Sequence, residues 1–164
     1  MQIQDKVGIV TGAASGIGRA TTLELITQGV KGIALVDLSE TAVVELAQQI
    51  NESAGRELAL AFAGDVTDAE FRARVFDETS HHHGIVQIMV PSAGIFRDRL
   101  AVKIERDTGE ANIYPVDMFR QVLEVNLIHP VYWAMEMIAR IAVDRNRQNL
   151  KKWHPDEKVQ GTII

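Results

Sequence analysis

A run of glycines near the start of the chain has the residue types and spacing that bind phosphate. The run TGAASGIG, residues 11–18, lies between a β-branched segment, residues 7–11, and a segment with helical spacing, residues 17–26. A glycine makes the tight turn and lets the backbone approach a pyrophosphate, while the N-terminus of the following helix presents free N–H groups to the anion. The spacing G-x-x-x-G-x-G in a strand–turn–helix context favours dinucleotide binding over an ordinary connecting turn.

An acidic side chain stands where the ribose of a bound dinucleotide would lie. Asp37 follows a second apolar segment, residues 31–36, about 20 residues after the glycine run. A carboxylate there accepts hydrogen bonds from both ribose hydroxyls and repels a 2′-phosphate, and the neighbouring Ala13, Ala14 and Leu38 supply no cation to hold one. The pattern therefore favours NAD over NADP. The alternative is an aspartate that belongs to the turn before the next helix.

These residues require a sheet that brings the ends of several strands together. Apolar runs typical of buried strands alternate with helical patterns, and the strand segments are residues 7–11, 31–36, 58–62 and 85–90. Helical spacing follows the first two, and after the third Thr67 and Glu70 predict a capping box that starts a third helix. The order βαβαβαβ with short connections predicts an α/β fold, a doubly wound parallel sheet of the Rossmann type with helices on both faces.

The second half of the chain has a different organisation. A turn signal at Asp107-Thr108-Gly109 between residues 102–104 and 111–113 predicts a small hairpin. A long helical pattern follows over residues 118–142, and we expect Pro130 to interrupt it. Residues 144–159 are charged and are typical of a solvated helix end and loop. The last residues, 161–164, have the composition of an opening fifth strand.

Length and composition fit one domain over residues 1–164 and exclude several classes of protein. The chain has 17 basic and 22 acidic side chains, a formal net charge of −5, and no cysteine. An acidic balance without a basic block argues against a nucleic-acid partner, and the missing cysteines exclude disulfides and thiol chemistry. No apolar run approaches the ~20 residues of a membrane span, and the N-terminus is polar. We therefore expect no membrane segment, no signal peptide and a cytoplasmic location.

The glycine run and three further motifs resemble the short-chain dehydrogenase/reductase family. TGAASGIG resembles the family's TGxxxGxG turn, and Gly64-Asp65-Val66 resembles the acidic pair after its third strand. Residues 84–94 resemble its fourth strand with the NNAG end, and Val125-Asn126-Leu127 resembles its asparagine site. The resemblance covers residues 6–164, the front part of the family's domain. It implies NAD as cofactor and contacts to it from Gly12, Ser15, Gly16, Ile17, Gly18, Asp37, Leu38, Asp65, Val66, Ser92, Ala93 and Gly94.

The resemblance assigns one residue of the catalytic class, Asn126. In the family, the backbone carbonyl of this asparagine holds a water in the proton relay. In a regular helix that carbonyl accepts the N–H of residue 130, and Pro130 has no N–H, so we expect the carbonyl to be free for a water. The alternative is a kinked helix with a polar residue at the break.

The chain departs from the family's pattern in two motifs. NNAG is replaced by Pro91-Ser92-Ala93-Gly94, so the hydrogen bonds between sheet and cofactor must differ there. The family's YxxxK pair is missing, because Tyr114 is followed four positions later by methionine and Tyr132 by glutamate. In the family, the catalytic serine would come just after Ile164. The expectation is a cofactor-binding part that stops at the start of the fifth strand and does not turn over alone.

Some residues that suggest other functions have simpler explanations. His81-His82-His83 are consecutive on a predicted helix and point in different directions, so we expect no metal site. Trp133 suits packing or an interface, and we expect Trp153 to anchor a charged loop. In the family, the helix over residues 126–141 packs against its copy in a homo-oligomer. The apolar residues expected to supply that surface are Met135, Met137, Ile138 and Ile141.

The sequence therefore favours an oxidoreductase that uses NAD(H) on a small alcohol or carbonyl substrate. In the family, a tyrosine moves the proton while hydride passes between nicotinamide and substrate. One alternative is a non-catalytic NAD-binding or interaction module, which the missing YxxxK supports. A weaker alternative is a different nucleotide-binding α/β protein, such as a flavodoxin-like domain.

Overall fold

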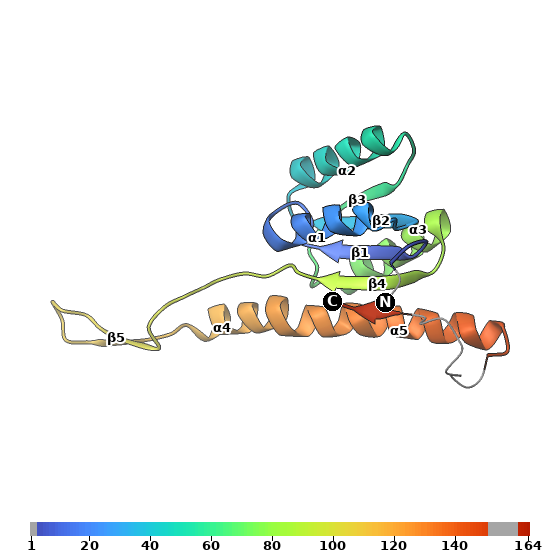
Figure 1. The fold of residues 1–164 in the computed structure, drawn as a ribbon. Coiled ribbons are helices and arrows are strands. Elements are labelled where there is room, and N and C mark those ends of the chain that lie inside the picture. Colours follow the sequence, from blue (N-terminus) through green and yellow to red (C-terminus); the bar gives the residue numbers. More distant parts are fainter. Residues whose placement is uncertain (1–2, 151–160) are drawn as a thin grey trace.

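A five-stranded parallel sheet forms the centre of the molecule in the computed structural model, which describes residues 3–150 and 161–164 (Figure 1). The strands lie in the order β3-β2-β1-β4-β7 and are β1 (Val7–Thr11), β2 (Gly32–Asp37), β3 (Ala59–Ala63), β4 (Val86–Pro91) and β7 (Thr162–Ile163). The predicted fifth strand is confirmed, because Thr162 and Ile163 pair in parallel with Ile88 and Met89 of β4.

Helices cover both faces of this sheet, as the doubly wound prediction requires. The covering helices are α1 (Gly16–Thr27), α2 (Glu40–Ala54), α3 (Ala69–His83) and α5 (His129–Arg147). Helix α4 (Val116–Leu123) and the π-helical turn η1 (Glu124–Ile128) precede α5, and α4 has no buried residue. One core cluster joins α1 and α2 to the sheet, and a second joins α3 and α5 to its other face. Figure 1 shows α1 and α2 on one side of the sheet and the long helix on the other.

The central strands are apolar throughout because both of their faces are buried. In β2, Ile33 and Leu35 belong to the core under α1 and α2, whereas Ala34 and Val36 belong to the core under α3 and α5. Successive side chains of a strand point to opposite faces, so a strand between two helical layers needs an unbroken apolar run. This is why continuous runs in the sequence predicted these strands to within one residue.

The predicted capping box at the start of the third helix is wrong. The N-cap of α3 is Asp68, whose carboxylate accepts hydrogen bonds from the N–H groups of Glu70 (2.8 Å) and Phe71 (3.2 Å). The hydroxyl of Thr67 instead donates to Asp65 at 2.8 Å. An aspartate one position later reaches the same free N–H groups, so it replaces the threonine as the cap.

The predicted hairpin is confirmed and forms an arm beyond the body of the protein. Strands β5 (Val102–Ile104) and β6 (Ala111–Ile113) pair in antiparallel register, and Gly109 in the turn has a φ of 72°. Figure 1 shows the arm projecting past the end of α4, away from the sheet. Its strands are exposed.

The α-helix is interrupted just before Pro130, as predicted, but the chain keeps its helical path. α4, η1 and α5 follow one another from Val116 to Arg147 and run as one rod in Figure 1. The chain widens into a π turn just before the proline, where the N–H of His129 bonds to the carbonyl of Glu124. A π turn absorbs a missing donor by shifting the hydrogen-bond register, so the helix continues.

The buried face of α5 differs from the predicted surface for a second copy. Met137 is only 1% exposed and Ile141 packs against the core under α3, so neither lies on a free surface. Met135 and Ile138 are 55% and 54% exposed. Apolar residues occupy both sides of this helix, so spacing alone did not separate the core side from the outer side.

Two predictions for the end of the chain are tested only in part. α5 carries the charged segment as far as Arg147, whereas residues 151–160, including Trp153, lie outside the described residues.

Trp133 is fully buried, which confirms packing and not an interface. Within the described part of the chain, no helix has the length and apolar character needed to span a membrane.

Candidate functional site

A cleft of about 580 Å³ opens at the carboxyl ends of the strands. Parallel α/β sheets bind ligands at this edge, where neighbouring connections diverge to opposite faces. All twelve residues that the resemblance assigned to the cofactor line this cleft: Gly12, Ser15, Gly16, Ile17, Gly18, Asp37, Leu38, Asp65, Val66, Ser92, Ala93 and Gly94. The structure thus brings together segments that are far apart in the sequence. It adds the lining residues Gly64, Ile95, Arg97, Gln121 and Val125.

The glycine turn forms one wall of the cleft and leaves no space for side chains at two positions. Gly12 has a φ of 66°, and a Cβ there would lie 2.9 Å from the backbone of Ala93. A Cβ on Gly18 would overlap the carbonyl of Gly12 and lie 2.6 Å from Oγ of Ser92. Gly16 has a φ of 48°, but a Cβ there would meet open space. The turn is therefore tight at Gly12 and Gly18 and open at Gly16, beside the cleft.

The N-terminus of α1 faces the same cleft without an acidic or capping side chain. Ser15 is the N-cap residue, its side chain makes no capping hydrogen bond, and the first turn of α1 contains no acidic residue. The first N–H groups of a helix have no partner within the helix and attract anions. This arrangement suits a pyrophosphate.

The carboxylate of Asp37 lies against the glycine turn at the end of β2. Its Oδ2 accepts a hydrogen bond from the N–H of Ala14 at 3.0 Å, and its Oδ1 accepts one from Ser39 at 3.1 Å. Leu38 beside it is 76% exposed and lines the cleft. Asp37 therefore fits both interpretations, the turn residue and the cofactor residue, because its carboxylate orders the turn and also lines the cleft.

The segment after β3 is held from two sides. The carboxylate of Asp65 accepts hydrogen bonds from the N–H (2.9 Å) and hydroxyl (2.8 Å) of Thr67. The carbonyl of Val66 accepts the indole N–H of Trp133 from α5 at 2.8 Å. The position of Asp65 and Val66 in the cleft thus depends on the core beneath α5.

The loop after β4 is tied to the end of β1. Ser92 Oγ donates to the carbonyl of Thr11 at 2.5 Å, and the N–H of Ala93 donates to Thr11 Oγ1 at 3.2 Å. Pro91 still pairs with Thr11 in the sheet register. The serine that replaces the family's asparagine therefore bonds to the neighbouring strand.

Asn126 does not line the cleft but clamps the loop that does. Its Oδ1 accepts the N–H of Ile95 at 2.8 Å, and its Nδ2 donates to the carbonyl of Ile95 at 2.8 Å. An amide can make this double contact because it carries both donors and an acceptor. Sequence reasoning considered only the carbonyl of Asn126 and missed this use of its side chain.

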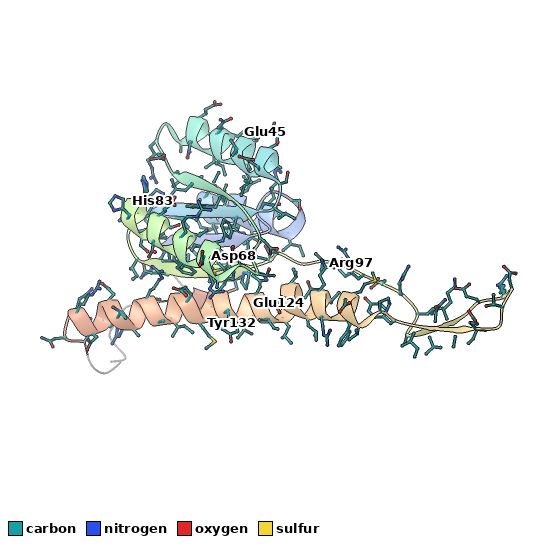
Figure 2. All side chains as sticks on the ribbon, turned by 180° about the vertical axis from the view of Figure 1, so that it is seen from behind. Glu45, Asp68, His83, Arg97, Glu124 and Tyr132 are labelled. Atoms are coloured by element: carbon teal, nitrogen blue, oxygen red, sulfur yellow. The ribbon has the colours of Figure 1, made fainter. Side chains whose placement is uncertain are left out.

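Cations and tyrosines are sparse at the cleft. Arg97 is the one basic side chain among the described residues that line it, and it lies where the chain leaves β4 for the arm (Figure 2). The hydroxyl of Tyr114 donates to the carbonyl of Arg97 at 2.6 Å, and Tyr132 lies on the exposed side of α5. Neither tyrosine is among the lining residues.

The three consecutive histidines occupy different environments at the end of α3. His82 lies 3.9 Å from a carboxylate oxygen of Glu57, whereas His83 is buried against Gly32. Among the residues that the structure describes, no group of three or more histidine, aspartate or glutamate side chains is arranged to hold a metal ion.

Comparison with known proteins identifies the family. Residues 6–149 match the family model for the short chain dehydrogenases. The chain therefore belongs to the short-chain dehydrogenase family, and the resemblance stated from its motifs is confirmed. The match removes the flavodoxin-like alternative.

Several curated relatives carry oxidoreductase names. Zerumbone synthase of Zingiber zerumbet is 32% identical over 151 residues, which is 92% of this chain and 51% of the relative. The 3-oxoacyl-(acyl-carrier-protein) reductase of Thermotoga maritima is 33% identical over 69% of this chain and 45% of its own length. The 15-hydroxyprostaglandin dehydrogenase (NAD+) of Bos taurus is 35% identical over 60% of this chain and 37% of its own. The chain spans about half the length of the first of these relatives.

A solved structure supports the same fold. A short-chain dehydrogenase structure from Novosphingobium aromaticivorans superposes with a TM-score of 0.72, at 21% identity, over 92% of this chain and 50% of its own. At this identity the likeness concerns the fold alone.

Proposed function

We propose that this chain is the NAD(H)-binding part of an oxidoreductase that interconverts a small alcohol and its carbonyl compound. The carboxylate of Asp37 carries the proposal, because it lies beside the glycine turn in the cleft. Arg97, the one cation among the described residues that line the cleft, follows β4 and not β2. A 2′-phosphate beside Asp37 would be repelled without a cation to hold it, which favours NAD over NADP.

The shape of the cleft supports a dinucleotide. The absent Cβ atoms of Gly12 and Gly18 leave the backbone accessible, and the open N-terminus of α1 suits the pyrophosphate. Asp37 would accept the ribose hydroxyls, and Asp65 with Val66 would border the adenine. NAD, when bound, supplies the acceptor or donor of hydride. The name of the Bos taurus relative, 15-hydroxyprostaglandin dehydrogenase (NAD+), supports the same cofactor.

Replacing Asp37 with asparagine is expected to weaken NAD binding roughly 10- to 100-fold, because hydrogen bonds from the ribose to a charged acceptor are stronger than those to an amide. NADP binding should fall much less, since the substitution also removes the repulsion of the 2′-phosphate. Isothermal titration calorimetry with NAD and NADP on both proteins measures the change.

Asp68→Asn is the matched control for Asp37→Asn. Asp68 caps α3 and is not among the residues that line the cleft, and asparagine caps helices about as well. The control should bind NAD like the wild type. Equal wild-type affinity for NAD and NADP, or unchanged NAD affinity in Asp37→Asn, would contradict the proposed cofactor.

A second candidate function is a module that holds NAD without chemistry. Its support is that neither tyrosine of the chain is followed by lysine at the fourth position, and neither lines the cleft. Both candidates share the prediction that the chain binds NAD but does not reduce or oxidise substrates by itself. Turnover of NADH with a panel of carbonyl compounds by this chain would contradict that shared prediction.

We also propose that the outer side of the long helix forms a homo-oligomer contact. Exposed apolar residues follow one another there at spacings of three and four, which places them on one side of the helix. This helix stripe consists of Leu127, Val131, Met135 and Ile138. A row of exposed apolar side chains of this length favours association.

Introducing glutamate at both Met135 and Ile138 is expected to convert the wild-type oligomer into a monomer, because association would then bury two charges. Sedimentation velocity at micromolar concentration measures the species. Val44→Glu, at an exposed apolar position on α2, should leave the oligomer intact. A monomeric wild type would contradict the proposed contact.

A further inference from the structure

The π turn leaves one carbonyl of the long helix without its usual donor. The N–H of His129 bonds to the carbonyl of Glu124, five residues earlier, so it is not available to Val125. The next residue, Pro130, has no N–H. The carbonyl of Val125 therefore lacks a main-chain donor in both the α and the π register.

The ring of His129 supplies the missing donor. Its Nδ1 lies 2.6 Å from the carbonyl oxygen of Val125, so Nδ1 carries the proton and donates. In the neutral ring, Nε2 then has a lone pair, and it lies 3.2 Å from the hydroxyl of Thr11. Because Nε2 can only accept in this tautomer, the hydroxyl of Thr11 donates to it.

The hydroxyl of Thr11 continues this chain of hydrogen bonds into the cleft. Its oxygen accepts the N–H of Ala93 at 3.2 Å, and Thr11 directly precedes Gly12 of the tight turn. In this series the N–H of Ala93 donates to the hydroxyl of Thr11, this hydroxyl donates to Nε2 of His129, and Nδ1–H of His129 donates to the carbonyl of Val125. Each of the three donors thus has one acceptor. His129 is 2% exposed and packs edge-on against Trp133, with ring centroids 6.2 Å apart. The series therefore connects the helix that carries Asn126 with two walls of the cleft.

We propose that His129 is a positioning residue, whose neutral ring couples the π turn to Thr11 and Ala93, so that the cleft binds NAD at full affinity only while this ring is neutral. The inference rests on the proposed NAD function. It concerns a residue to which the motifs of the sequence assign no role.

Protonation of His129 removes the acceptor of the Thr11 hydroxyl and so disrupts this series of hydrogen bonds. A second proton on Nε2 would face the hydroxyl of Thr11, whose oxygen would then meet two N–H donors while its own hydrogen lost its acceptor. A buried donor without a partner is costly. The hydroxyl would have to rotate, and its hydrogen bond with the N–H of Ala93 would shift.

The surroundings of His129 keep the ring neutral at neutral pH. Burial, the largest cause, lowers the pKa of His129 below its usual value of 6.5, and Arg72 of α3 also lowers it. The hydrogen bond to Val125 and the charge of Asp65 act in the opposite direction. The ring is therefore neutral above its usual pKa and gains its proton only as the pH falls below that value. NAD affinity should be constant above about pH 6.5 and decrease only on acidification below it.

The test is NAD binding by calorimetry between about pH 8 and 5.5. The protonated form should bind NAD about 3- to 10-fold more weakly than the neutral form, because one or two ordered hydrogen bonds are lost, so the wild-type affinity should fall toward the acidic end of this range. His129→Gln should bind NAD within about threefold of the wild type at neutral pH and show no such fall, since its amide oxygen can accept from Thr11 but does not titrate.

His83→Gln is the matched control, because His83 is the other buried histidine whose pKa is lowered by burial. It packs against Gly32 at the start of β2, and Figure 2 shows it at the opposite end of the molecule's sheet from Arg97. This variant should keep the wild-type fall in affinity. A wild type whose NAD affinity is unchanged on acidification, or a His129→Gln variant that keeps the fall, overturns the inference.

Nitrogen-15 NMR of the histidine rings tests the geometry without the cofactor. At neutral pH, the His129 ring should be neutral and protonated at Nδ1, and the Nε2-protonated tautomer would overturn the inference. A wild type that binds no NAD at any pH overturns the proposed function, and with it the cofactor role of His129. NAD binding without pH dependence overturns only the role of His129.

Discussion

Gly18→Ala is expected to lower the free energy of unfolding by about 3 kcal/mol and to remove measurable NAD binding. A Cβ at this position overlaps the backbone carbonyl of Gly12, which cannot move aside as the end of a flexible side chain could. To relieve the overlap, α1 must shift away from the turn. That shift displaces the N–H groups proposed to hold the pyrophosphate.

Gly16→Ala gives the control within the same turn. A Cβ at Gly16 meets nothing within 4 Å, so only the positive φ of 48° opposes the substitution, at a cost of about 1 kcal/mol. Urea denaturation compares the two variants, and calorimetry with NAD compares their binding. The prediction fails if Gly18→Ala is as stable as Gly16→Ala.

Trp133→Ala is expected to cost about 3–5 kcal/mol of stability, in the range of large aromatic deletions from a core. The indole is fully buried, with ring centroids 5.9 Å from Phe76 and 6.4 Å from Phe71, so its removal leaves a cavity under α5. The carbonyl of Val66 also loses its donor. Since Val66 lines the cleft, the variant should bind NAD more weakly even where it remains folded.

Two substitutions separate the contributions of Trp133. Trp133→Phe keeps most of the apolar volume but leaves the carbonyl of Val66 without a donor, and should cost about 1–3 kcal/mol. Tyr132→Ala removes the neighbouring ring, which is half exposed, and should cost less than about 1 kcal/mol. Thermal or urea unfolding measures all three. A Trp133→Ala variant no less stable than Tyr132→Ala would contradict the assignment of Trp133 to the core.

Local patterns were sufficient for much of the fold. The strand at Val7–Thr11 was predicted with its observed bounds, because a short run without charged residues and rich in β-branched side chains is typical of a strand buried on both faces. The hairpin around Gly109 was also predicted, since its turn residues and flanking segments are adjacent in the chain. These features depend on neighbours in sequence, which is why a single sequence is enough to predict them.

Predictions failed where two local solutions compete. Thr67 and Asp68 can both cap the same helix, and contacts of Thr67 with Asp65 decide between them. Met135 and Met137 are both apolar, and only packing under α3 assigns Met137 to the core. The interruption at Pro130 was predicted, but its kind was not, because a proline can end a helix or follow a π turn, and a side chain that satisfies the free carbonyl favours the turn.

The sequence by itself determined the glycine turn, the acidic residue after the second strand and the order of strands and helices, because these are set by residue type and by spacing along the chain. Only the tertiary structure decided which distant groups meet. Asn126 pairs with Ile95 across 31 positions, and His129 reaches Thr11 across 118. The sheet order places β4 beside β1, and α5 packs with α3 on one face of that sheet. Hydrogen bonds therefore form between residues whose spacing in the sequence carries no signal.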